Sequence, residues 1–235
     1  MLAMDTIDYT RQRSFLDPEV FNVSNKRIDI IGVGATGSYV AFQLAKMGIS
    51  NIHVWDDDKV EPHNLPNQLY GIEDVGKFKV DALRDNIKKF TNIDIITHNE
   101  RVTKDTGMLG DIVFLLPDSM AARKEIYENC LKLGLTQICI ETRLSATQGR
   151  VYAFNPTELL DQNRWEGTLY SDEEAEVSEC GTKIMMGASS SMVASIAVWQ
   201  FIKWVKGQND EDGKTNPEFE LMFSMCPNFN FMYRL

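Results

Sequence analysis

The first 150 residues alternate between short apolar runs and segments in which apolar residues recur at helical spacing. The run 27–32 (RIDIIG) is apolar and ends in glycine, which is typical of a buried parallel strand. In the next segment, 36–48, the periodicity predicts a helix that ends at a glycine. The same criteria predict strands at 52–55, 94–97, 112–116 and 136–140, and helices at 77–90 and 119–133. Such alternation predicts an α/β fold with a doubly wound, mostly parallel sheet covered on both faces.

The pattern changes after residue 150. A short strand is predicted at 151–154, and the polar stretch 155–183 predicts a long loop. The apolar segment 185–205 contains several serines, which favours a late buried helix over a membrane span. The tail 219–235 alternates aromatic and polar residues, which is compatible with an edge hairpin or with a partner surface. We therefore expect a main domain over 1–207, with a core at 26–150 and a crossover loop at 155–183, and a C-terminal extension over 208–235.

Composition and charge narrow the classes of function. The 235 residues are 43% hydrophobic and 25% charged, which is typical of a globular chain. The formal net charge of −10 disfavours a nucleic-acid surface, because such surfaces need clustered Lys and Arg. The four cysteines form no CxxC pair, which disfavours a structural zinc site. The first residues lack the apolar core of a signal peptide, so we expect a cytoplasmic protein without a membrane anchor.

A glycine-rich turn follows the first predicted strand and opens a helix. Gly32, Gly34 and Gly37 have the GxGxxG spacing, which permits a tight turn, close approach to a phosphate and close helix–strand packing. The following helix N-terminus favours an anion. Asp56 ends the second strand, where a carboxylate can bind ribose hydroxyls. These features predict a Rossmann-like nucleotide site in the core, and they are equally compatible with a dinucleotide and with ATP.

The segment between residues 56 and 79 is longer and more polar than an ordinary dehydrogenase needs. The amides of Asn64, Asn67 and Gln68 lie beside leucines that can anchor the segment in the core. Lys79 begins the next helix, where its ammonium group can lie near the glycine turn. Cationic and amide donors near a phosphate stabilise the charge that develops in phosphoryl or nucleotidyl transfer.

Five motifs in this order are similar to those of the E1-like activating enzymes, the group that includes ThiF, MoeB, HesA and the adenylation domains of ubiquitin-activating enzymes. They extend over residues 9–123, about half of the chain. The motifs are YTRQ at 9–12, GVGATG at 32–37, DDDKVEPHNLPNQ at 56–68, GKFK at 76–79 and DS at 118–119.

The resemblance implies an enzyme that uses Mg-ATP to adenylate the C-terminal carboxylate of a small ubiquitin-like or sulfur-carrier protein. Asn64 and Lys79 would contact the phosphates, and Asp118 would bind Mg²⁺. Arg11 would reach the phosphates of a neighbouring subunit, which requires a homodimer. The nucleotide itself would be held by Gly32, Gly34, Gly37, Asp56, Asp58, Asn67 and Gln68.

Three positions depart from the family pattern, with His63 in place of serine, Asn67 in place of arginine and Ser119 in place of asparagine. Without the arginine, one phosphate-facing cation is missing, and Arg11, Arg13 or Arg123 would have to replace it. A non-catalytic E1-like scaffold subunit is therefore an alternative, favoured by Asn67. A second alternative is an NAD- or FAD-linked oxidoreductase, and a third is an adenylyltransferase that acts on a peptide.

The cysteines differ in their expected roles. In related enzymes a cysteine near the position of Cys180 takes the activated carrier as a thioester or acyl disulfide. Glu179 would raise the pKa of the Cys180 thiol and thus disfavour this role, so an incidental cysteine is the alternative. We expect Cys130 and Cys139 to be core residues.

Overall fold

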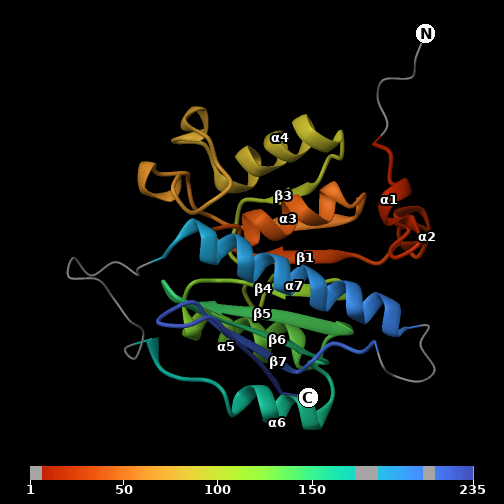
Figure 1. Cartoon of the computed structure of the whole chain (residues 1–235), viewed down its shortest axis with the longest axis vertical. Coiled ribbons are helices and arrows are strands. Elements are labelled where there is room, and N and C mark those ends of the chain that lie inside the picture. The colour runs from red at the N-terminus through yellow and green to blue at the C-terminus, as the bar shows by residue number, and fades with distance from the viewer. Residues whose placement is uncertain (1–6, 173–184, 209–214, 235) are drawn as a thin grey trace.

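The computed structural model describes residues 7–172, 185–208 and 215–234. A single eight-stranded sheet forms its centre, with the strand order β3-β2-β1-β4-β5-β6-β7-β8 (Figure 1). The strands are β1 (Ile28–Ile31), β2 (Ile52–Trp55), β3 (Ile96–His98), β4 (Ile112–Leu115), β5 (Ile138–Leu144), β6 (Gln148–Phe154), β7 (Glu220–Ser224) and β8 (Asn230–Arg234).

The first five strands are parallel and the last three are antiparallel. The order of the parallel strands, 3-2-1-4-5, reverses direction between β1 and β4. A doubly wound sheet binds its ligand at the carboxyl ends of the strands, at this point of reversal. The fold class predicted from the sequence is therefore confirmed.

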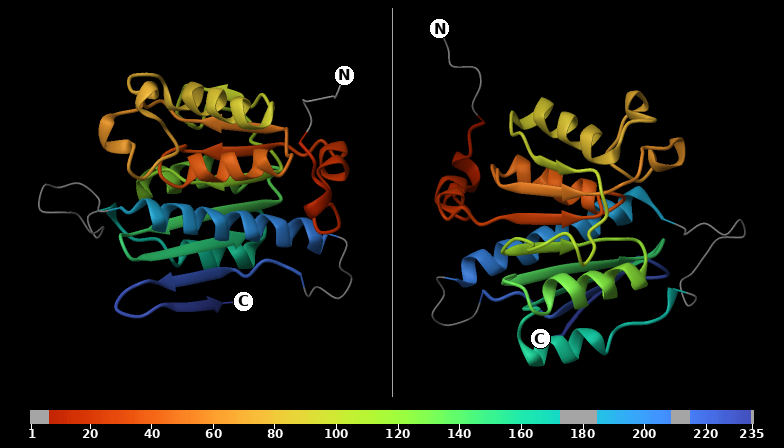
Figure 2. Two further views of the ribbon diagram at one scale, coloured as in Figure 1. Left: turned by 45° about the horizontal axis from the view of Figure 1, so that its top comes forward. Right: turned by 180° about the vertical axis from the view of Figure 1, so that it is seen from behind.

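Helices cover both faces of the sheet (Figure 2). Side chains of α3, α4 and α7 join one buried apolar cluster, and those of α5 and α6 join the other. The helices are α1 (Thr10–Arg13), α2 (Pro18–Val23), α3 (Gly37–Lys46), α4 (Lys79–Thr91), α5 (Met120–Ile126), α6 (Leu159–Glu166) and α7 (Gly187–Gly207), with short 3-10 turns at Pro62–Asn64 and Ile72–Asp74 and a π-helical turn at Tyr127–Leu131.

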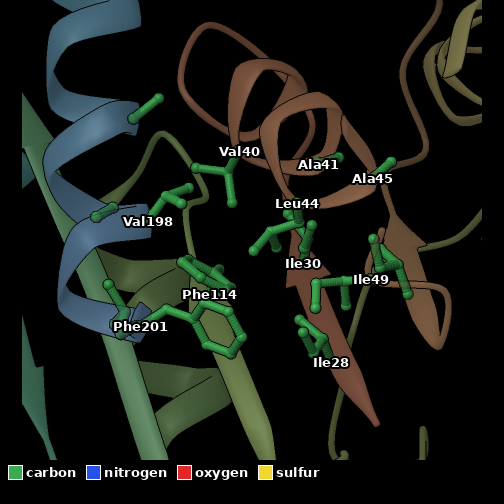
Figure 3. Close-up of a cluster of buried hydrophobic side chains, with 14 of the residues drawn as sticks. Ile28, Ile30, Val40, Ala41, Leu44, Ala45, Ile49, Phe114, Val198 and Phe201 are labelled. Atoms are coloured by element: carbon green, nitrogen blue, oxygen red, sulfur yellow. The ribbon is translucent and has the colours of Figure 1, made fainter. Parts of the chain in front are cut away.

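The larger cluster fixes α3 and α7 against the first strands (Figure 3). Val40 and Leu44 of α3 face Ile30 of β1, and Phe201 of α7 meets Phe114 of β4 with ring centroids 6.3 Å apart. All five side chains are fully buried. This packing sets the direction of α3, and it thus positions the glycine turn that precedes this helix.

The second half of the chain differs from the prediction in two places. Residues 155–183 were expected to form a loop, but the structure places α6 inside this range. The helix was missed because its inward face consists of Gln162 and Trp165, which do not form an apolar repeat. In the tail, β7 and β8 pair as an antiparallel hairpin at the sheet edge, which confirms the hairpin alternative. The division at residue 207 stays a prediction, and β7 continues the same sheet.

Within the described residues, no helix combines the length and the apolar character that crossing a bilayer requires.

Candidate nucleotide site

A cavity of about 1140 Å³ lies at the carboxyl ends of the parallel strands. Its wall is formed by the segments that follow β1, β2, β3, β4 and β5. It brings together nine of the residues predicted from the sequence: Gly32, Gly34, Asp56, Asp58, Asn64, Asn67, Gln68, Lys79 and Asp118.

The glycine turn has the geometry that its sequence predicts. Gly32 has a φ of +86°, and a Cβ atom there would lie 2.7 Å from the carbonyl oxygen of Leu116. A Cβ atom on Gly37 would lie 1.9 Å from the carbonyl oxygen of Gly32. Both positions therefore exclude any side chain. Gly37 packs the turn against the helix instead of lining the cavity, whereas Gly34 does line it.

Asp56 connects the glycine turn to the segment after β2. Its Oδ2 accepts a hydrogen bond from the backbone N–H of Val33 at 2.9 Å, and its Oδ1 accepts one from Asp58 at 2.9 Å. Burial raises the pKa of the Asp56 carboxyl, while the Lys79 ammonium group and these two N–H groups oppose the rise. Each carboxylate oxygen can accept further bonds, so Asp56 can also receive a ribose hydroxyl.

Lys79 begins α4 and is held by Asp58. The Lys79 Nζ lies 2.7 Å from Asp58 Oδ2, and the Lys79 backbone N–H donates to the Asp58 carbonyl oxygen at 2.9 Å. The lysine side chain is only 9% exposed, whereas that of Asp58 is 59% exposed. The ion pair with Asp58 thus places the ammonium group in the wall of the cavity, within the space that a bound anion would enter.

The polar segment after β2 presents amides whose hydrogen-bonding capacity is only partly used. Asn64 Oδ1 accepts the Glu61 N–H at 2.9 Å, which orients the amide and leaves its Nδ2 without a partner among the described residues. The buried oxygens of Asn67 and Gln68 also have no partner there. Buried acceptors without a partner are costly, so this wall favours a ligand that supplies donors and acceptors.

The residues present fit a nucleotide and a divalent cation. The glycine turn, Lys79 and the Asn64 amide are donors suited to phosphate oxygens. Asp56, Asp57 and Asp58 offer carboxylate oxygens that lie within 4.8 Å of one another, and Asp118 lines the same cavity after β4. Carboxylate oxygens are the ligands that Mg²⁺ prefers.

Besides Gly37, one predicted residue in the described part of the chain does not line the cavity. Arg11 lies in α1, whose Gln12 side chain donates to the Met47 carbonyl oxygen at 2.7 Å. Met47 directly follows α3, so α1 packs at the end of the sheet opposite to the glycine turn (Figure 1). Arg11 of the same chain therefore cannot complete the site. Cys180 lies outside the described residues.

Arg123 is unsuited to replace the missing family arginine. Its guanidinium group is paired with Glu141 and donates to the carbonyl oxygens of Thr142 and Pro117. It is almost completely buried. The other two cysteine predictions hold, because Cys130 and Cys139 are both buried.

Sequence reasoning missed Arg101, which lines the cavity directly after β3. Its Nε lies 2.9 Å from Asp57 Oδ2, and Asp57, with smaller contributions from Asp58 and Asp118, raises the pKa of this guanidinium group. Its position just beyond a parallel strand is the signal that could have identified it. A second group was missed in the second half of the chain, where Arg143 near the end of β5, Gln148 at the start of β6 and Tyr170 after α6 line the same cavity.

The fold is a doubly wound α/β domain, and its cavity, the candidate nucleotide site, lies at the topological switch point of the sheet. The profile of the ThiF family matches residues 9–231. The chain therefore belongs to the ThiF family.

Among curated proteins, the sulfur carrier protein ThiS adenylyltransferase of Escherichia coli is 25% identical over 216 residues, which are 88% of this chain and 79% of the relative. The ubiquitin-like modifier-activating enzyme 5 of Caenorhabditis elegans is 28% identical over 66% of this chain and 42% of its own length. An uncharacterized protein of Sinorhizobium fredii, y4qC, is 30% identical over 59% of this chain. The chain spans 27% of that protein, and less than half of two of these three relatives.

Solved structures support the fold. PaaA superimposes with a TM-score of 0.69 at 22% identity, covering 97% of this chain and 73% of PaaA. Escherichia coli MccB in complex with N-formylated MccA superimposes with a TM-score of 0.72 at 16% identity, covering 96% of this chain and 71% of MccB.

Proposed function

We propose that this protein is an ATP-dependent adenylyltransferase that activates the C-terminal carboxylate of a small ubiquitin-like or sulfur-carrier protein. The observation that carries the proposal is the convergence of the glycine turn, Asn64, Lys79 and Asp118 on one cavity. The relatives named as an adenylyltransferase and an activating enzyme support the same reaction class.

The reaction joins two anions, so the protein must align them and reduce their repulsion. A carboxylate oxygen of the carrier attacks the α-phosphorus of ATP, the bond from that phosphorus to the bridging oxygen breaks, and pyrophosphate leaves with the bonding electrons. The product is an acyl adenylate. At neutral pH the carboxylate is already ionised, so no side chain has to remove a proton from it.

Lys79 and the N–H groups of the glycine turn would stabilise the negative charge on the phosphates. Asp56 would hold the ribose, and Asn64 would contact the phosphates through its Nδ2 atom. Asp118 would hold Mg²⁺, which neutralises phosphate charge when it is bound. Arg143, Gln148 and Tyr170 line the same cavity, and this part of the wall would guide the carboxyl end of a carrier toward the α-phosphate.

Two finer elements belong to the same proposal. Arg11 would act on the site of a second subunit in a homodimer, because the cavity of the same chain lies at the other end of the sheet from α1. The Cys180 thiolate would attack the acyl carbon of the adenylate, so that the carrier becomes a covalent thioester adduct and AMP leaves with the bonding electrons. Mass spectrometry of wild type and Cys180→Ser after incubation with carrier and Mg-ATP tests the second element, since the serine variant should lose the adduct.

Exchange of labelled pyrophosphate into ATP tests the central reaction. We expect exchange when Mg-ATP is combined with the cognate carrier from a set of small proteins that end in Gly-Gly. A carrier that is amidated at its C-terminus should give none, because it lacks the attacking carboxylate. Absence of exchange with every carrier that binds would contradict the catalytic proposal.

A non-catalytic scaffold subunit is the second candidate, favoured by Asn67 in place of a cation. It would bind a carrier but show no exchange. A nicotinamide- or flavin-linked oxidoreductase is less favoured, since it gives Lys79 and Asn64 no role. A thermal-shift comparison separates it, because Mg-ATP and not NAD(H) or FAD should raise the melting temperature.

A further inference from the structure

The glycine turn is held by hydrogen bonds to side chains as well as by its own backbone. The Tyr70 hydroxyl donates to the Val33 carbonyl oxygen at 2.7 Å, and both residues are buried. The Ser38 hydroxyl donates to the Gly34 carbonyl oxygen at 2.7 Å and accepts the Leu69 N–H at 3.1 Å. Two residues of the segment after β2 are thereby bonded, directly or through Ser38, to the turn that precedes α3.

We propose that Tyr70 is a positioning residue for the nucleotide site, and that its hydroxyl, together with Ser38, locks the glycine turn in the conformation that binds phosphate. The inference rests on the proposed function, because it assigns a role to Tyr70 at the same site. It adds to that proposal a residue that contacts no substrate.

The planarity of the peptide bond explains how the Tyr70–Val33 hydrogen bond can orient the next N–H group of the turn. In a trans peptide, the C=O of one residue and the N–H of the next point in opposite directions. Because the Val33 carbonyl accepts the Tyr70 hydroxyl in the protein interior, the Gly34 N–H points away from Tyr70, and Gly34 itself lines the cavity. The Ser38 bond to the Gly34 carbonyl constrains the Ala35 N–H in the same manner.

Without the hydroxyl, the peptide between Val33 and Gly34 would lose the hydrogen bond that holds its carbonyl oxygen in the interior. Glycine tolerates many backbone angles, so rotation of this peptide meets little steric resistance at Gly34. A rotated peptide would present a carbonyl oxygen to the phosphate and repel it. The Tyr70–Val33 hydrogen bond also joins the glycine turn to the segment that carries Asn64 and Gln68. The N–H groups of the turn and the amides of that segment therefore keep one relative position.

The aromatic ring of Tyr70 packs in the larger apolar cluster, so Tyr70→Phe keeps the packing and removes only the hydroxyl. Tyr127→Phe is a matched control. Tyr127 is also buried, its hydroxyl donates to Glu166 at 3.0 Å, and it lies outside the cavity wall. Both variants lose one hydrogen bond of a buried tyrosine.

Two measurements test the proposal. The first is hydrogen–deuterium exchange of peptides that cover 30–42 in the protein without nucleotide, where Tyr70→Phe should accelerate exchange and Tyr127→Phe should not. The second is calorimetric binding of ATP, where Tyr70→Phe should raise the Kd about three- to tenfold, the range expected for the net value of one hydrogen bond, and Tyr127→Phe should leave it unchanged.

Each outcome decides the matter. Unchanged exchange at 30–42 overturns the positioning role, as does faster exchange with an unchanged Kd. Equal effects of the two variants would mean a general loss of stability and would also overturn it. If the wild type binds no ATP, the proposed function fails on that result alone, while the exchange experiment still decides whether Tyr70 holds the turn.

Discussion

The parallel and antiparallel halves of the sheet differ in where their polar groups lie. Strands β1 and β4 are buried at every position, and the residues after them form the cavity. At the other edge, all five residues of β8 are exposed. In a parallel sheet, successive strands end at the same edge, so the segments that follow them converge. In the antiparallel hairpin of β7 and β8, neighbouring strands end on opposite sides of the sheet, so the segments that follow them do not converge. The residues of the proposed chemistry therefore lie mainly in the parallel half.

The two halves meet at β5, where Glu141 is completely buried between two arginines. Arg143 Nε lies 2.9 Å from Glu141 Oε1, and Arg123 pairs with the same oxygen. Trp165 of α6 donates to Glu141 Oε2 at 2.8 Å. This junction ties α5, β5 and α6 together, and its two arginines line the cavity.

The largest effect is expected from Glu141→Ala, which would leave two buried arginines without their counter-ion. Removing one partner of a buried ion pair costs about 3–5 kcal/mol. Urea unfolding monitored by circular dichroism measures the loss. Glu128→Ala is the control, because among the described residues Glu128 pairs only with Lys124, on the surface, and its loss should cost about 1 kcal/mol or less. Equal losses would contradict a special role of the junction.

The next effect concerns catalysis in the parallel half. Lys79→Met removes a cation from the cavity and should lower pyrophosphate exchange about 10²–10³-fold, the usual loss of one preorganised transition-state donor. Lys88→Met is the matched control, since Lys88 lies on the same helix and also pairs with an aspartate, Asp94, at 2.6 Å. It lies outside the cavity wall and should leave exchange unchanged. A similar loss in both variants would indicate damage to α4 instead.

These two experiments probe regions that differ in how well the sequence predicted them. The buried runs of β1, β2 and β4 and the glycine turn were located to within a residue or two, because an apolar run and a glycine motif are local signals. Helix α6 was not predicted. Leu159 and Leu160 at its start are 76% and 68% exposed, while Gln162 and Trp165 are buried. Its inward face depends on tertiary partners that no local pattern shows.

The site shows the same division. Asp56, Asn64, Lys79 and Asp118, which line the cavity, were predicted because each occupies a motif position in the chain. The contacts that organise them were not found. Tyr70 and Val33 are 37 residues apart, and Arg101 and Asp57 are 44 apart. Such pairs are joined only when β1, β2 and β3 lie side by side, so a single sequence cannot reveal them.

A smaller effect on stability is expected when the pH is lowered, and it arises from a histidine pair in the parallel half of the sheet. His53 of β2 lies 3.0 Å from His98 of β3 through Nδ1 and Nε2. Burial, aided by Arg27, lowers the pKa of His53 to about 4, from an ordinary 6.5. The folded state therefore binds fewer protons than the unfolded state between these values, so stability should fall as the pH drops from 6.5 to 4.

Substitution of His53 tests whether this histidine lowers the stability as the pH falls. His53→Gln should make the free energy of unfolding depend less on pH in this window, by about 1 kcal/mol after solvent screening is allowed for. His63→Gln is the control, because His63 is 74% exposed. Urea unfolding at pH 4.5 and pH 7 measures both. Identical pH dependence of the His53 variant and the wild type would contradict the prediction.

The smallest effect is expected at the antiparallel edge. Met232 of β8 is 56% exposed, so Met232→Lys should change the free energy of unfolding by no more than about 0.5 kcal/mol, as is usual for surface substitutions. A lysine on an edge strand also discourages pairing with other chains. Unfolding at two protein concentrations measures the effect. A loss above about 2 kcal/mol, or one that grows with concentration, would show that β8 is covered in solution. The contrast between a buried parallel half and an open antiparallel edge would then be confined to the single chain.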